Sequence, residues 1–513
     1  MATKKTALPE LWQEFERAKH YNYSIGLYET VKQNENFYIG KQWEGVRAEG
    51  LDKPVLNMLR RVVTYFISMI VTDDIAAVFT PFDSYRHLEA EILSSEVDRV
   101  IEQTKFKSKC RELLRNAAVD GDGCFYFHFD PEVRTGQAAK GDIRVENLDN
   151  TNVLFGNPHS AEVQEQPYLL IAMRRTVEEV RREMKQFGRG ADAELVRPDA
   201  ENAYFEEKES EGKLSTVVVK LFKNESGTVS AVKYTKDAIV RPEWDTGLSL
   251  YPVAFMNWES VKSCYHGQSP ITGLIPNQIF VNKLFAMAMQ AVKLMAFPKV
   301  IFNRNLIGEW SNKLDDAIGV NGDPNQQIFS GWRAPDMSSQ VMTLIDKTIS
   351  YTRDFMGASD AALGNVRPDN TSAIIAVQKA SAAPLELQKL GFYQFVEDSV
   401  RILADMMATY YGARYVKLSD EATGETYMSL FDFGTLRDLA MQLKVDVGAA
   451  SYWSEVAQLQ TLDNLFEKGV ITDAATYLEG IPDSYIRGKQ KILRKLREQA
   501  EMSAPEQPGA AAQ

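Results

Sequence analysis

The stretch that decides the fold is SPITGLIPNQIFVNKLFAMAMQAVKLMAFPKVIF, residues 269–302. Apolar side chains recur at helical spacing along one face of it, at Phe280, Leu284, Met287, Ala291 and Met295. The other faces are also largely apolar, and a helix of this composition needs neighbours on most of its sides. By itself the pattern favours an ordinary buried core helix, and packing against identical helices in a closed ring is the alternative. Pro298 predicts the end of the helix.

Downstream, a segment rich in Gly, Asn, Asp and Pro leads to a second helical pattern, SQVMTLIDKTISYTRDFM, at residues 339–356. The two predicted helices therefore flank one insertion. The connector GASDAALGNVRPDN follows at residues 357–370 and precedes the longest helical run in the chain, residues 371–412. Because Pro384 removes a backbone hydrogen bond from that run, we expect a kink there.

Upstream, the patterns predict helices first and a mixed region after them. Helical spacing covers residues 8–34, 54–69 and 89–120, where Gly121 is the stop signal. Short β-favouring runs between turns occupy residues 141–251, around one helix with the sequence TVEEVRREMKQFG. Strand-like alternation returns at residues 413–447, and the C-terminal part is helical again. The predicted fold class is therefore α+β.

Composition excludes several functional classes. Hydrophobic residues make up 44% of the 513 residues and charged residues 25%, which is typical of a folded globular chain. The net charge of -12 has the wrong sign for a protein that grips nucleic acid over its whole surface, so any DNA contact must be local or weak. The 3 cysteines are widely spaced and odd in number, which argues against a disulfide framework or a zinc site and favours a reducing cytosol.

Targeting and membrane signals are weak. The N-terminal residues become charged too early to supply the apolar core of a signal peptide. The most apolar stretches are VVTYFISMIV and LFAMAMQAVKLMAF, and both are shorter than the roughly 20 residues of a spanning helix. We therefore predict no transmembrane segment and no membrane partner.

The sequence contains no recognisable catalytic constellation. It lacks the GxxxxGK[ST] phosphate loop of ATP-driven motors, the GxGxxG and GxSxG signatures, and the HExxH zinc motif. The five histidines are scattered, and nothing supports a histidine-based triad. Asp120 and Asp122 in VDGDGCF lack the remaining ligands of a calcium loop, so a turn between helix and strand is the better interpretation. We expect no catalytic residues, no metal and no cofactor.

Four segments in this order resemble the portal proteins of tailed bacteriophages, especially those with long tails. Near the N-terminus, NFYIGKQWEG followed by KPVLNMLRRVVTYFISMI is similar to the opening of that family. The central segment IPNQIFVNKLFAMAMQAVKLMAFPKVIF resembles its stem helix running into the clip. The stretch ALGNVRPDNTSAIIAVQKASAAPLELQKLGFYQFVEDSVRILADMM resembles its tunnel loop and long kinked helix, and VDVGAASYWSEVAQLQTLDNLFEKGVIT with YLEGIP resembles its passage from wing to crown.

The resemblance implies a portal fold: a mixed α/β wing, an α-helical stem, a small α/β clip, a long kinked helix and an α-helical crown. The implied boundaries are a wing at 1–268, a stem helix at 269–297, a clip at 298–338, a second stem helix at 339–356, a tunnel loop at 357–370, the long helix with the rest of the wing at 371–449, a crown at 450–500 and a disordered tail at 501–513. Element borders inferred in this way are uncertain by several residues.

The resemblance also implies a function. Portal subunits form a homo-oligomeric ring, twelve-fold in the particle, that serves as head-to-tail connector at a capsid vertex. Double-stranded DNA passes through the ring during packaging and ejection. The expected partners are the large terminase, a head-tail adaptor, and the major capsid and scaffolding proteins. The expected location is the portal vertex of the virion, after synthesis in the host bacterial cytoplasm. In this family a separate ATPase drives packaging, so the portal subunit itself needs no phosphate loop. The absence of that motif from the sequence is consistent with the expectation that the chain is not an enzyme.

Two sets of site residues follow from the implied layout. The DNA channel, made of tunnel loop and stem, is expected to use Lys347, Arg353, Asn365, Arg367 and Asn370. Partner docking on the clip is expected to use Lys299, Arg304 and Lys313. The alternatives are another structural head-tail protein of a phage and a nucleic-acid-processing enzyme; a closed ring without nuclease or ATPase activity would separate the portal from both.

Overall fold

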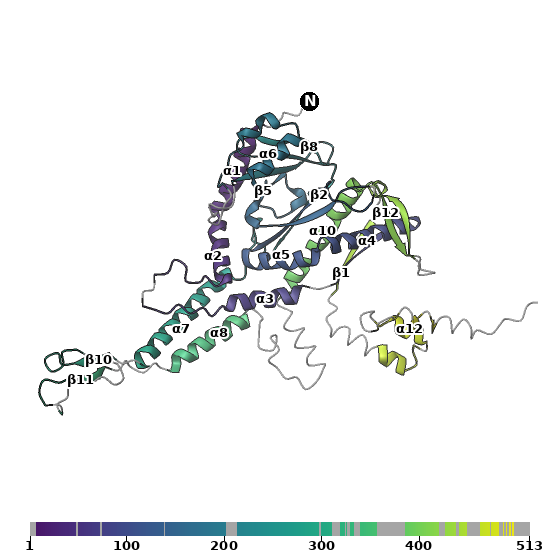
Figure 1. Ribbon diagram of the computed structural model, residues 1–513. Helices are drawn as coiled ribbons and strands as arrows, with labels where there is room; N and C mark the ends of the chain where they lie inside the picture. Colours follow the sequence, from purple (N-terminus) through teal and green to yellow (C-terminus); the bar gives the residue numbers. More distant parts are fainter. Residues whose placement is uncertain are drawn as a thin grey trace, which may run out of the picture. The chain divides into compact units, whose positions relative to one another are not determined.

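The computed structural model describes residues 7–47, 50–71, 74–137, 139–201, 213–296, 299–309, 319–323, 325, 329–332, 339–355, 385–419, 426–437, 441–448, 462–471, 473–481 and part of 486–496. The chain divides into two compact units, one of residues 1–71 with 77–445 and one of residues 72–76 with 446–513. Helices and strands both contribute extensively to the larger unit, which confirms the predicted α+β class (Figure 1).

The N-terminal helices are α1 (Leu8–Ser24), α2 (Leu27–Ile39), α3 (Met58–Ile70), α4 (His87–Gln103) and α5 (Phe106–Asp120). The single helix expected over residues 8–34 is in fact two, because Gly26 adopts a left-handed conformation with φ 69° between α1 and α2. A second break separates α4 from α5 at Lys105, which also has a positive φ, 54°. The predicted stop at Gly121 is confirmed, since this glycine caps α5 with φ 101°.

Two antiparallel sheets follow. The smaller has the order β3-β2-β9, with β2 at Asp122–Asp130, β3 at Asp142–Leu148 and β9 at Val253–Asn257. The larger has the order β4-β5-β6-β7-β8, at Val153–Phe155, Tyr168–Thr176, Leu214–Lys223, Val229–Tyr234 and Ile239–Asp245. Helix α6 (Val177–Gln186) follows β5 and begins with a capping box between Thr176 and Glu179.

The larger sheet is covered by α1 on one face. Leu11 and Phe15 of α1 are buried in one cluster with Leu170, Val218 and Tyr234 of the sheet. The Tyr234 hydroxyl donates to the Leu11 carbonyl oxygen at 3.1 Å, which satisfies the polar end of a fully buried ring. Side chains of a strand alternate between its faces, so the residues next to these in sequence point to the opposite face of the sheet.

The remaining elements of the larger unit are α7 (Ile275–Ala296), β10 (Lys299–Phe302), β11 (Phe329–Trp332), α8 (Ser339–Phe355), α10 (Glu386–Tyr410), β12 (Ala413–Ser419) and β13 (Thr426–Asp432). β1 (Asp74–Pro81) pairs with β14 (Met441–Gly448). Residues 371–384 and the kink expected at Pro384 lie outside the described residues. In the smaller unit, α12 (Ala474–Glu479) places the Tyr477 ring 4.6 Å from that of Phe466.

Helix α10 is fixed along its length to the β-sheets. The Phe395 ring lies 5.1 Å from the Phe125 ring of β2, edge on. Near the helix end, one Asp405 carboxylate oxygen accepts the Ser249 and Leu250 backbone N–H groups at 2.8 and 3.0 Å. The Tyr410 hydroxyl donates to the Thr246 carbonyl oxygen at 2.8 Å. The contacts of Asp405 and Tyr410 join the end of α10 to the turn that connects β8 with β9, whereas Phe395 packs on β2.

A buried carboxylate joins the start of β2 to the segment that leads into α7. One Asp122 oxygen accepts from the Gly267 backbone N–H at 2.6 Å and from Asn257 Nδ2 at 2.8 Å. The other accepts from Asn150 Nδ2 at 3.0 Å and lies 2.7 Å from His266 Nδ1. Asp122 is 1% exposed. We call these five residues the Asp122 node. Helix α5 ends at Asp120 and β2 begins at Asp122, which confirms the turn between helix and strand predicted for VDGDGCF.

Replacing Asp122 by Asn should destabilise the larger unit by about 3 kcal/mol, because it leaves buried donors and the facing His266 without their carboxylate. Urea unfolding followed by circular dichroism measures the change. Asp52→Asn is the matched control, since Asp52 makes an exposed ion pair with Lys293 and its loss should be nearly neutral. An Asp122→Asn protein as stable as wild type would refute the structural role of the node.

Candidate nucleic-acid channel

Helices α7 and α8 lie side by side and lead away from the sheets to the hairpin of β10 and β11 (Figure 1). Their contact is a short apolar seam in which Val281 and Leu284 of α7 meet Ile345 of α8, all of them buried. In the hairpin, Lys299 pairs with Trp332 and Phe302 with Phe329. Two helices therefore flank one insertion, as the sequence predicts, and the paired strands β10 and β11 are a feature of that insertion that the sequence pattern did not predict.

The N-terminal half of α7 is held by two buried amides, which we call the amide clamp. Gln278 donates to the Leu56 carbonyl oxygen at 2.6 Å and accepts from the Met58 N–H at 3.0 Å. Asn282 accepts from the Leu56 N–H at 3.3 Å and donates to Gln42 Oε1 at 2.6 Å. The two side chains also bond to each other at 3.0 Å. The clamp ties α7 to the segment that precedes α3.

The C-terminal half of α7 carries exposed apolar side chains. Met287 is 52% exposed, Val292 54% and Met295 43%. Leu284, from the same predicted stripe, is instead buried against α8. Phe280 of the same stripe is 44% exposed, so exposed apolar side chains occur in both halves of α7 and are more numerous in the second.

One helical stretch, Thr272–Ala296, has the length and mean hydropathy, 1.3, of a helix that could cross a membrane, counting only the described residues. The expectation that this apolar segment is too short is therefore wrong, since the helix continues through its polar residues. The amide clamp lies within the stretch and bonds to this chain's own backbone, as expected for a helix rooted in protein. Only 28% of its most apolar window is buried.

The predicted site residues are only partly described. Lys347 is exposed on α8, and Arg304 is exposed in the turn after β10. Arg353 lies in the last turn of α8 and Lys299 begins β10, but the structure does not describe their side chains. The other four, Asn365, Arg367, Asn370 and Lys313, lie outside the described residues. Only Lys347 and Arg304 have described side chains, so the roles of all eight stay predictions.

Sequence reasoning missed the amide clamp. Its signal is present in the sequence: Gln278 and Asn282 are four residues apart in an otherwise apolar helix, so both amides lie on one face. Buried amides need hydrogen-bond partners. What the sequence does not show is that Gln42, in the FYIGKQW element, is one of them.

The sequence matches the family described as phage P22-like portal protein over residues 14–513. That match covers essentially the whole chain. The chain belongs to the P22-like phage portal protein family. A comparison with curated proteins gives no match. Portal proteins of this family are structural ring subunits at the capsid vertex of the virion, where they act with the capsid and the terminase in genome packaging. The match does not specify tail length, so the long-tailed assignment stays a prediction.

Replacing Asn282 by Ala should loosen the root of α7, because the Leu56 N–H and the Gln42 amide lose their partner. We expect hydrogen exchange in peptides covering residues 54–58 to become about tenfold faster, which corresponds to a loss of about 1.4 kcal/mol. Lys283→Ala is the control, since Lys283 is exposed on the same helix. Unchanged protection in Asn282→Ala would show that the clamp does not anchor α7.

Proposed function

We propose that α7 and α8 are the two stem helices of the portal and that the β10–β11 hairpin belongs to its clip. The observation that carries this proposal is the pair of helices itself. They share a short apolar seam, are anchored at one end by the amide clamp and are joined beyond the other end through the hairpin. The wing then comprises residues 1–268 together with 371–449, with the tunnel loop at 357–370 and the crown at 450–500.

The uncovered half of α7 supports ring formation through this helix. A monomer that exposes Met287, Val292 and Met295 on one helix gains stability by covering them. Identical subunits repeated by rotation supply that cover through heterologous contacts, and such contacts close when the rotation divides the circle. We propose a ring of twelve subunits in the particle.

Within such a ring, the channel should touch DNA weakly. The net charge of -12 opposes adhesion of a polyanion, and each added phosphate contact would slow its passage. Lys347 and Arg353 on α8, with Asn365, Arg367 and Asn370 in the tunnel loop, would position the duplex without reading its sequence, because phosphate contacts carry no base information.

In this arrangement of stem, clip and wing, the catalytic steps of packaging belong to partner proteins. The family is structural, and we propose that this chain itself hydrolyses nothing, binds no cofactor and contacts no membrane. The large terminase would dock on the clip during packaging and a head-tail adaptor afterwards, while the wing would face the major capsid and scaffolding proteins. Synthesis in the host cytoplasm agrees with the three cysteines, which are all free.

Introducing a charge on the exposed apolar half of α7 should prevent ring closure. Native mass spectrometry of the wild-type protein should give a closed ring, of about 0.69 MDa for twelve subunits of 57.8 kDa. Val292→Glu should shift the population to monomers, whereas Gln290→Glu, at an exposed polar position two residues earlier, should leave rings intact. A wild-type protein that stays monomeric at all concentrations, or Val292→Glu rings in normal yield, would contradict the proposal.

Charge reversals on clip and stem should have separable effects. Arg304→Glu should weaken terminase docking by about tenfold, since it replaces an attractive rim charge by a repulsive one, and should leave the ring intact. Lys347→Glu should spare docking and change the length of capsid-protected DNA. Pull-down with purified terminase and gel sizing of packaged DNA measure the two effects. If Arg304→Glu alters DNA length alone, or Lys347→Glu alters docking alone, the assignment of these elements is wrong.

A further inference from the structure

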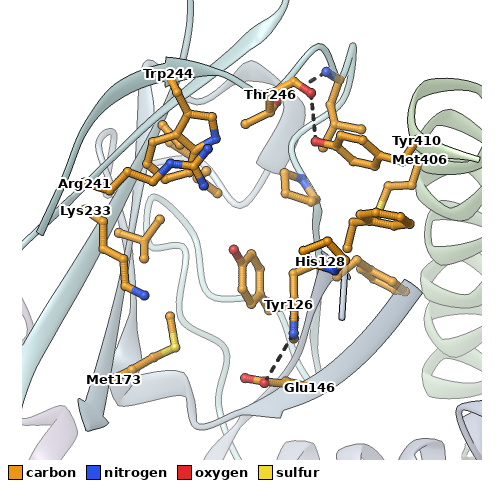
Figure 2. A pocket seen from close by; sticks show the side chains of 18 of the residues that line it. Tyr126, His128, Glu146, Met173, Lys233, Arg241, Trp244, Thr246, Met406 and Tyr410 are labelled. Atoms are coloured by element: carbon orange, nitrogen blue, oxygen red, sulfur yellow. Dashed lines mark hydrogen bonds and ion pairs between the residues drawn. The ribbon is translucent and has the colours of Figure 1, made fainter. Parts of the chain in front are cut away.

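A cavity of about 420 Å³ lies between the two sheets of the larger unit and the C-terminal end of α10 (Figure 2). Strands β2 and β3 form one side, β5 to β8 form the other, and Met406 and Tyr410 of α10 close a third. The sheet face involved is opposite to the one that α1 covers. Cavities of this size fall in the range that holds small organic ligands, roughly 300–1,000 Å³.

One cation in the cavity wall, Arg241, stacks on aromatic rings. The Arg241 guanidinium lies between two rings, 3.7 Å from the centroid of Trp244 and 4.4 Å from that of Phe187. Among the described residues it makes no ion pair, whereas Lys233 contacts Glu183 at 2.6 Å. Stacking on the rings holds the guanidinium plane and leaves its N–H groups for an acceptor.

A neutral donor faces the same space. The Tyr126 hydroxyl points into the cavity (Figure 2), and no hydrogen bond to it is found within the described part of the chain. Burial raises the pKa of this phenol, so the group stays protonated and able to donate. A second polar atom, His128 Nδ1, is buried without a partner among the described residues. Burial lowers the pKa of this histidine and favours its neutral form.

Three carboxylates line the wall, and each has a partner. Asp245 accepts from the Thr228 hydroxyl at 2.9 Å and from the Gly247 backbone N–H at 2.9 Å. Glu183 is paired with Lys233. Glu146 lies 3.9 Å from Arg175 and 3.8 Å from His128. The Arg241 guanidinium and the Tyr126 hydroxyl are therefore left as donors to a ligand, and this pair favours an anionic group on it. The rest of the surface includes Met173, Leu221 and Met406, which suit an apolar body.

We propose that this cavity binds a small organic anion with an apolar, planar body, whose charged group is held by Arg241 and Tyr126. The two sheets and α10 come from one chain, so the site is complete within a subunit. The proposal concerns a site apart from α7, α8 and the hairpin and does not depend on their assignment. The anion is a carboxylate or a phosphate, which share the acceptor geometry that a guanidinium recognises.

Isothermal titration calorimetry on the full-length protein tests the site with four probes. Benzoate and phenyl phosphate carry both required parts, benzamide is the neutral match of benzoate, and inorganic phosphate lacks the ring. We expect one of the two ring-bearing anions to bind at one site per subunit, and benzamide and inorganic phosphate to bind at least about tenfold more weakly. The preferred anion identifies the carboxylate or the phosphate as the natural group.

Variants locate the binding. Arg241→Gln should raise the dissociation constant of the preferred anion by about tenfold or more. Tyr126→Phe, which removes only the hydroxyl, should raise it by about threefold. Lys236→Gln removes a positive charge that pairs with Glu201 outside the cavity and should change nothing. Absence of binding by both anions at 5 mM, about the limit of the method, would overturn the proposal. Equal binding of benzamide would do the same, as would affinity unchanged in both Tyr126→Phe and Arg241→Gln.

Discussion

The larger unit depends on one buried carboxylate. Asp122 stands where α5 ends and β2 begins, and its two oxygens accept bonds from Asn150 between β3 and β4, from Asn257 at the end of β9 and from Gly267 before α7. An unpaired carboxylate in such a place would be expensive, and here its bonding positions are matched by donors. Close packing adds to the constraint, since a Cβ on Gly121 would meet the Gly267 carbonyl oxygen at 2.6 Å. The chain entering α7 is thereby fixed against the sheets.

Along α7, the side chains are more fully covered by the rest of the chain near the Asp122 node than near the C-terminal end of the helix. Its first half is held by the amide clamp and by the contact of Val281 and Leu284 with Ile345 of α8, and Phe280 is its one large apolar side chain that is exposed among the described residues. Its second half exposes methionine and valine side chains. This gradient is the physical basis of the division proposed between a rigid wing and a stem that becomes complete only through neighbouring subunits.

The sequence predicted those features of helices and turns that depend on residues close together in the chain. The sequence TVEEVRREMKQFG forms α6 with a capping box, and Gly121 ends α5, as expected from residues close together in the chain. Strand β5 lies within the region predicted to hold short strands, but its own bounds were not predicted, because its run YLLIAMRRT begins apolar without alternation and fits helix or strand equally. The amide clamp and the cavity could not be predicted, since they join side chains more than 100 residues apart. The family could be recognised from the order of its segments, whereas the individual DNA and docking residues could not be tested.

If α7 and α8 form the stem of a closed ring, neighbouring subunits cover the exposed half of α7. A cryo-electron microscopy reconstruction of the assembled protein, at a resolution that shows side chains, would reveal this arrangement. We expect α7 and α8 to surround the central channel, with Met287, Val292 and Met295 buried against the next subunit. A ring whose channel is lined by other elements, with these three side chains still in solvent, would contradict this arrangement.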